Sequence, residues 1–150
     1  KTMNTKHYNL LLADDDEDDC DFFKEALDEI SIETSLNMVH DGVQLMDYLK
    51  ANESKLPDVV FLDLNMPRKN GLECLAEIKE DEKLKELPII IFSTSLDSEI
   101  VNNLYKNGAS FYIRKPGDFS KLKKVIENAL TNASENNFKQ PERAHFILQP

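Results

Sequence analysis

The sequence predicts an α/β protein built on a doubly wound, five-stranded parallel sheet with helices on both faces. Short apolar runs alternate five times with segments whose apolar residues recur at helical spacing. The runs are almost continuously apolar, which is typical of strands that helices cover on both sides. The ends of four runs add a third observation, because each is followed by a residue able to do chemistry: Asp14, Asp63, Ser93 and Lys115.

The first half of the chain begins with a buried strand in the apolar run from Leu10, which leads directly into six acidic residues. Helical spacing of apolar residues then predicts a helix from about Asp18 to Glu29, and the acids at its start complement the helix dipole. We interpret Asp16 to Asp19 as a solvated helix start. A strand at Ser35–Val39 and a helix that follows Gly42 come next.

Proline and glycine mark the boundaries in the second half. Pro57 precedes the third strand, Pro88 opens the fourth, and Gly108 stops the helix before the fifth. The elements expected here are a strand at Asp58–Leu62, a helix after Gly71, a strand at Pro88–Phe92, a helix around Ile100–Tyr105, a strand at Phe111–Arg114 and a helix at Phe119–Thr131.

The bulk properties place these elements in one domain, residues 8–131, and exclude several classes of partner. Because 150 residues can bury one sizeable core, we expect no separate output domain. A net charge of −10 opposes binding to nucleic acid and to anionic membranes, which leaves proteins and cations as partners. No apolar stretch is long enough to span a membrane, and the cysteines form no Cys-x-x-Cys pair, so we expect a cytoplasmic location.

The polar residues at the strand ends should meet, because ligands of doubly wound sheets bind beyond the carboxyl ends of the strands. Asp15, Asp63 and a backbone carbonyl from the loop after Asp63 offer the oxygen ligands that Mg²⁺ prefers, and Asp14 can hold a metal-bound water. Lys115 and Ser93 can neutralise charge on a phosphoryl group. Asp63 is then placed to attack phosphorus as a nucleophile and to become an aspartyl phosphate.

One set of residues carries a family resemblance. The set consists of Asp14 and Asp15, the stretch Asp63-Leu64-Asn65-Met66-Pro67, Gly71, Ser93 and Lys115-Pro116. With these spacings, the chain resembles the receiver domain of two-component response regulators, of the single-domain chemotaxis type, over residues 8–131. The segments DGVQLMDYL, LDLNMPRKNGLE and NGASFYIRKPGDF are most similar to stand-alone receivers associated with phytochrome-type histidine kinases. The resemblance implies a flavodoxin-like fold with strand order 2-1-3-4-5.

The resemblance also implies roles for the residues of the acidic pocket. Asp63 would be the phosphoacceptor and Lys115 would contact the phosphoryl group. The cofactor would be Mg²⁺, held by Asp14, Asp15, Asp63 and the backbone carbonyl of Asn65. The phosphoryl group would come from a histidine kinase or a phosphotransfer protein, and a downstream protein target would receive the signal.

A switch and a cis peptide bond are further implications of the resemblance. Ser93 would move toward the phosphate, Tyr112 would change rotamer with it, and Pro116 would follow a cis bond. The altered surface around the fourth helix and fifth strand would be the output. The chain departs from the commonest family pattern in having Ser93 instead of threonine, in Thr94 where a smaller residue is common, and in Gly117 after the proline.

Three other functions are weighed against this reading. A Mg²⁺-dependent phosphohydrolase with an aspartyl nucleophile would carry a second acid two residues after the nucleophile, where this chain has Asn65. A nucleotide-binding domain would need a glycine-rich loop, but the four glycines are dispersed. A receiver-like interaction domain could act without phosphorylation. We expect no enzyme beyond self-phosphorylation from phosphodonors and autodephosphorylation.

The tail, residues 132–150, is polar until Phe146, Ile147 and Leu148. These apolar residues could dock on this chain, on a second copy or on a partner, and disorder is a further alternative. Our hypothesis is that the tail contributes to a homodimer.

Overall fold

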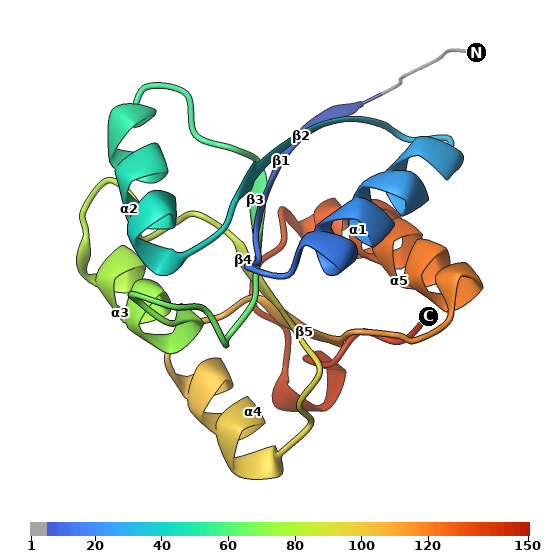
Figure 1. Ribbon diagram of the computed structural model, residues 1–150. Coiled ribbons are helices and arrows are strands. Elements are labelled where there is room, and N and C mark those ends of the chain that lie inside the picture. The colour runs from blue at the N-terminus through green and yellow to red at the C-terminus, as the bar shows by residue number, and fades with distance from the viewer. Residues whose placement is uncertain (1–5) are drawn as a thin grey trace.

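Five strands and five α-helices alternate along residues 6–150, the part of the chain that the computed structural model describes. All strand pairs are parallel and the sheet order is β2-β1-β3-β4-β5, so the predicted fold class is confirmed (Figure 1). The elements are β1 (His7–Ala13), α1 (Glu17–Glu29), β2 (Glu33–Val39), α2 (Gly42–Ala51), β3 (Val59–Leu62), α3 (Gly71–Glu80), β4 (Ile89–Ser93), α4 (Ser98–Lys106), β5 (Phe111–Arg114), α5 (Phe119–Thr131), and the 3₁₀ turns η1 (Ala133–Asn136) and η2 (Arg143–His145).

Helices cover both faces of the sheet. Figure 1 shows the sheet nearly edge-on, with α1 and α5 on one side and α2 and α3 on the other. Side chains along each strand alternate between these faces: Leu10 and Leu12 pack toward α1 and α5, whereas Leu11 and Ala13 pack toward α2, α3 and α4. The same alternation gives the central strands their continuous apolar sequence.

The outer strand β2 begins earlier than the sequence predicts, at Glu33 rather than Ser35. Its burial alternates between exposed and half-buried positions, because only one side of the strand faces a neighbour and one face is open to water. Polar residues at the exposed positions hide the strand from a search for apolar runs.

An Asp or Asn side chain caps the amino end of every α-helix within residues 6–150. Each cap accepts a hydrogen bond from a backbone N–H of the first turn, which satisfies a donor that has no partner within the helix. The caps are Asp16, Asp41, Asn70, Asp97 and Asp118. The acidic run after β1 is thus partly structural, and α1 starts at Glu17, one residue earlier than predicted.

Glycines allow the loop after β3 to pack tightly against its surroundings. A Cβ on Gly71 would lie 2.3 Å from the carbonyl oxygen of Asp63, and one on Gly42 would lie 2.1 Å from that of Lys69. Backbone, rather than a movable side chain, occupies both positions. The loop from Asp63 to Asn70 therefore has one close-packed path between β3 and α3.

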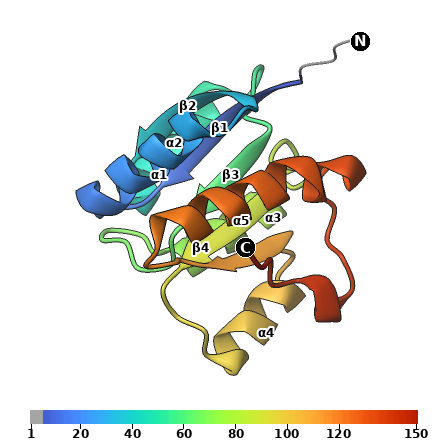
Figure 2. The same cartoon turned by 90° about the vertical axis from the view of Figure 1, so that its right-hand side faces the viewer.

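The tail turns back after η1 and reaches β5 at the edge of the sheet. Figure 2 shows it descending from the end of α5 to the level of α4 before the C-terminus returns to the sheet. The sequence left open whether the apolar end of the tail docks on this chain, on a second copy or on a partner. In this structure it docks on the same chain. Among the described residues, no helix combines the length and the apolar character that crossing a membrane requires.

We expect Gly71→Ala to lower the free energy of unfolding by about 1–3 kcal/mol, because the added methyl group overlaps the Asp63 backbone. Gly117→Ala is the matched control, since a Cβ there meets nothing within 4 Å. Urea unfolding of the two variants measures the difference. Equal losses in both would show that the loop after β3 can move aside.

Candidate functional site

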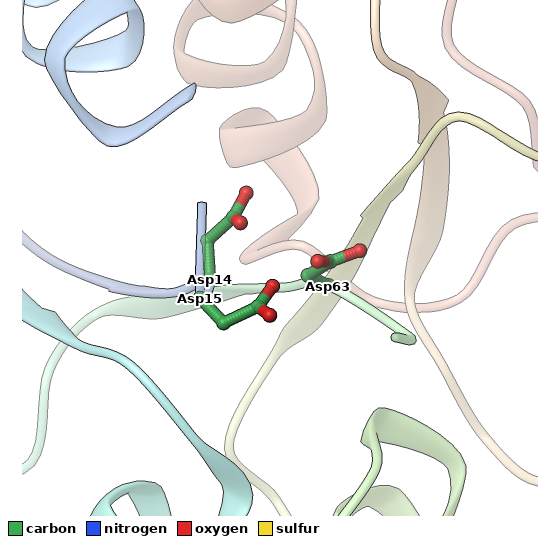
Figure 3. Close-up of side chains that lie close together, drawn as sticks. All are labelled: Asp14, Asp15 and Asp63. Atoms are coloured by element: carbon green, nitrogen blue, oxygen red, sulfur yellow. The ribbon is translucent and has the colours of Figure 1, made fainter. Parts of the chain in front are cut away.

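Three carboxyl groups meet at the carboxyl edge of the sheet. Asp14 and Asp15 follow β1, and Asp63 follows the neighbouring strand β3. One oxygen from each lies within 4.8 Å of the others, as Figure 3 illustrates. Asp14 and Asp63 are buried, whereas Asp15 is exposed. The structure thus brings together the three acids that the sequence singled out, and it leaves one side of the cluster open to solvent.

Burial of like charges makes this cluster suited to a cation. Burial raises the pKa of Asp63 to about 6, even though Lys115 opposes the shift, and it also raises the pKa of Asp14. Asp14 Oδ2 is buried and accepts no hydrogen bond from the described residues. All the donor atoms are oxygens, which are the ligands of hard divalent cations. The residues present therefore fit Mg²⁺.

Lys115, in the loop after β5, brings the opposing charge into the cluster. Its Nζ lies 2.8 Å from Asp14 Oδ2, without the angle of a hydrogen bond, and 3.7 Å from Asp63 Oδ2. Although burial alone would lower the pKa of Lys115, its close contacts with the carboxylates of Asp14 and Asp19, and then with that of Asp63, raise it above its usual range. The ammonium group is therefore charged at neutral pH.

Asp19 is a member of the site that the sequence did not single out. Lys115 Nζ donates a hydrogen bond of 2.7 Å to Asp19 Oδ2, a shorter contact than it makes with Asp63. Asp19 lies on the first turn of α1, where the helix turns this side chain toward the end of β1. Lys115 is thus held between the start of α1 and the acidic cluster.

The loop that carries Asn65 is fastened to the loop between β2 and α2. Arg68 Nη1 donates to the buried carboxylate of Asp41 at 3.1 Å, and Gly42 packs against the backbone of Lys69. The Asp41 carboxylate also accepts a hydrogen bond from the Gln44 backbone N–H, and this bond is the main reason why the pKa of Asp41 is lowered. These contacts restrict the backbone beside Asp63, although the orientation of the Asn65 carbonyl toward a metal stays a prediction.

Ser93 ends β4, and Tyr112 lies on the neighbouring strand β5, where it pairs with Ile91. Ser93 is fully buried at the end of β4, and its hydroxyl accepts a hydrogen bond of 3.3 Å from the Ser95 backbone. The Tyr112 hydroxyl donates to the Ser95 carbonyl oxygen. The segment after Ser93 therefore connects the acidic pocket to Tyr112. The switching roles of the two residues stay predictions.

The predicted cis peptide bond before Pro116 is wrong for this structure. No cis bond occurs within the described residues, so Lys115 and Pro116 are joined in trans. Proline reduces the preference for trans to about 0.5–1 kcal/mol but does not reverse it. The trans backbone already carries the Lys115 ammonium to Asp14 and Asp19, so this contact needs no cis bond.

Comparison with known families decides what kind of site this is. Residues 10–127 match the family described as the response regulator receiver domain. The chain belongs to this family. The receiver fold and its place in two-component signalling follow from that membership, and the resemblance read from the sequence is confirmed.

Relatives of this receiver include proteins of phytochrome signalling. The response regulator Rcp1 of Synechocystis is 31% identical over 79% of this chain and 83% of its own length. The crystal structure of the phosphorylated cyanobacterial phytochrome response regulator RcpA has a TM-score of 0.76 at 33% identity, covering 85% of this chain and 96% of RcpA. That of the Mn²⁺-bound form of Rcp1 has a TM-score of 0.73 at 30% identity, covering 85% and 92%.

We expect Asp63→Asn to raise the free energy of unfolding by about 1–2 kcal/mol at pH 8 without divalent cations. The pKa of Asp63 is raised from 3.8 to about 6 in the folded protein, so ionisation above that range favours the unfolded chain. The gain should fade below about pH 4, where both states hold the proton. Urea unfolding at the two pH values measures it.

Asp47→Asn on α2 is the control, because it removes an exposed carboxylate from a helix that supplies none of the described pocket groups. Added Mg²⁺ should stabilise the wild type and the control more than Asp63→Asn. An Asp63→Asn gain that was the same at pH 4 and pH 8 would contradict the assigned burial effect.

Proposed function

We propose that this protein is a phosphorylation-controlled signalling receiver that accepts a phosphoryl group on Asp63 from a histidine kinase or a phosphotransfer protein. The single observation that carries the proposal is the position of Asp63. Its buried carboxylate lies at a strand end, with two further acids on one side and the Lys115 ammonium 3.7 Å away. This arrangement supports attack on phosphorus, because opposite charge is already in place for the phosphoryl oxygens.

Transfer proceeds by in-line displacement. An oxygen of Asp63 forms the new bond to phosphorus while the phosphorus–nitrogen bond of the donor phosphohistidine breaks, and the histidine nitrogen keeps the electron pair. Lys115 then moves from its contacts with Asp14 and Asp19 to a phosphoryl oxygen, and the Ser93 hydroxyl donates to another. Because Asp63 is buried, bulk water reaches its carboxylate only from the open side of the pocket.

Mg²⁺ is the cofactor of this proposal, and Asp14, Asp15, Asp63 and the Asn65 carbonyl would hold it. When bound, the ion neutralises charge on the transferring phosphoryl group. The unsatisfied oxygen of Asp14 and the clustered carboxylates support this choice. Two relatives add support by analogy, since Rcp1 is known in a Mn²⁺-bound form and RcpA in a phosphorylated one.

The message passes on by protein contact rather than by catalysis on a substrate. We place the output at the surface around α4 and β5, where Tyr112 contacts the segment after Ser93. The net charge of −10 supports protein partners over nucleic acid or membranes. A cytoplasmic location is part of the proposal and is supported by the buried free thiols of Cys20 and Cys74.

We expect incubation with acetyl phosphate and Mg²⁺ to add one phosphoryl group, about 80 Da, to the wild type and none to Asp63→Asn. Intact-protein mass spectrometry measures the gain, and chelation of Mg²⁺ should abolish it. Asp47→Asn is again the control for loss of a surface charge. A folded wild type that gains no mass in any condition would favour the interaction domain that acts without phosphorylation.

We expect Asp19→Asn to accelerate phosphorylation by acetyl phosphate about threefold, or roughly 0.6 kcal/mol in the barrier. The substitution removes one of the two close carboxylate contacts that hold the ammonium group away from Asp63, and only the contact with Asp14 is left. The rate of mass gain under limiting acetyl phosphate measures the effect.

Asp18→Asn is the matched control, because Asp18 is exposed on the same turn of α1 and makes no hydrogen bond to Lys115. Its rate should equal that of the wild type. A slower rate in Asp19→Asn would mean that Asp19 guides Lys115 toward the phosphoryl group instead of holding it back.

A further inference from the structure

The end of the tail adds one parallel bridge to the free edge of the sheet. The Tyr112 N–H donates to the carbonyl oxygen of Phe146 at 3.0 Å, and the Leu148 N–H donates to the carbonyl oxygen of Tyr112 at 2.9 Å. Ile147 is thereby paired with Tyr112 in a parallel bridge. Because β5 is the outermost strand, these backbone groups of Tyr112 would otherwise lack a strand partner.

Phe146 anchors this bridge on the output side of the protein. Its ring is fully buried, with its centroid 5.1 Å from that of Tyr105 on α4 and 6.3 Å from that of Tyr112. The Tyr105 hydroxyl donates to the carbonyl oxygen of Pro141 at 2.7 Å. Gln140 donates to the Tyr105 carbonyl oxygen at 2.7 Å, which fixes the start of the same segment.

The tail divides into a core part and a docking segment. Phe138 is buried in the core between the sheet, α1 and α5, and its ring meets that of Tyr8 edge to face, with 6.3 Å between the ring centroids. We call residues 139–150 the docking segment, because their contacts described above are with α4 and β5. Arg143, for example, donates to Asn102 on α4 at 2.8 Å.

The docking segment has open hollows on both of its flanks. One cavity of about 690 Å³ lies between the segment and α5, lined by Asn128, Asn132 and Gln140 among others. A second, of about 720 Å³, lies between Ile147 and the loop around Pro116. Phe146 and the bridge at Tyr112 are the buried part of the attachment, and side-chain hydrogen bonds at Tyr105, Gln140, Arg143 and Asn128 add to it.

Tyr112 connects the docking segment to the pocket. Its hydroxyl donates to the Ser95 carbonyl oxygen, two residues beyond Ser93, while its backbone holds both bonds to the segment. A shift of the Ser93–Ser95 segment therefore acts on the strand residue to which the tail is bound. No other described residue has hydrogen bonds to both the segment after β4 and the bridge.

We propose that the docking segment is an exchangeable intramolecular ligand of the α4 and β5 surface, and that the external partner of this surface is an extended protein segment of the same chemistry. Such a partner would pair with Tyr112 as a parallel strand and would place an aromatic side chain where Phe146 lies. Phosphorylation favours the exchange by moving Ser93 and Tyr112. This coupling rests on the proposed function, whereas the exchange itself does not.

The test uses the full chain and, as probe, a fluorescent peptide with the sequence of residues 139–150, KQPERAHFILQP. Phe146→Ser should free the surface, and fluorescence anisotropy should show at least tenfold tighter peptide binding than the wild type. His145→Ser is the control, because its side chain is exposed next to the anchor. A peptide in which serine replaces the phenylalanine should not bind. Equal affinity of all three proteins would overturn the proposal.

Hydrogen exchange in the wild type tests the same exchange without a variant. The Tyr112 and Leu148 amides should exchange at least fivefold faster after phosphorylation, while the Ile91 amide in β4 should not change. Ile91 protection in Phe146→Ser also checks that this variant is folded. A phosphorylated protein with unchanged Tyr112 and Leu148 protection would overturn the coupling and leave the proposed function standing.

Failure of Asp63 to take up a phosphoryl group would contradict the proposed function, and the Phe146→Ser comparison would still decide the exchange. Sedimentation separates the intramolecular ligand from the homodimer hypothesis. A wild type that sediments as a dimer, together with a monomeric Phe146→Ser, would overturn the proposal and assign the docking segment to a second copy of the chain.

Discussion

The rest of the structure depends on an imbalance of charge at the carboxyl edge of the sheet. Asp14 and Asp63 are buried there, Asp15 and Asp19 lie beside them, and Lys115 is the ammonium group that contacts the cluster. All five α-helices start at this edge, because each follows a strand directly, so their positive amino ends partly offset the negative charge. Holding these like charges together lowers the free energy of unfolding, and the packed faces of the sheet offset that loss. The pocket therefore remains responsive to an added cation or phosphoryl group.

Most of the fold is predictable because each of its sequence patterns indicates only one type of secondary structure. Continuous apolar runs with proline or glycine at their ends place β3, β4 and β5 to within a residue. The edge strand β2 is harder, since its exposed positions carry Glu33, Ser35 and Asn37, and alternation with polar residues resembles a loop. Backbone pairing with β1, a long-range interaction, sets where β2 begins.

The sequence predicts which residues at the strand ends form the pocket, but it does not predict all the contacts between them. Asp19 is indistinguishable from its acidic neighbours in the sequence, and only the start of α1 at Glu17 turns it toward Lys115. The trans bond at Pro116 was also beyond the sequence, because a proline makes both isomers accessible and the motif alone does not decide between them. The binding site of the Phe146 ring is formed by the rings of Tyr105 on α4 and Tyr112 on β5. These two residues come together only in the folded protein, so the sequence pattern does not reveal the site.

The two edges of the sheet are protected from other chains by different means. On β2, polar side chains at alternate positions make the edge unattractive to an apolar strand, and this protection is permanent. On β5, the protection is the bridge at Tyr112, which lasts only while the tail is in place. Release of the tail would therefore expose an unpaired strand edge that can pair with other chains. Solubility at high protein concentration is best served by keeping these backbone hydrogen bonds, whereas signalling requires that they break.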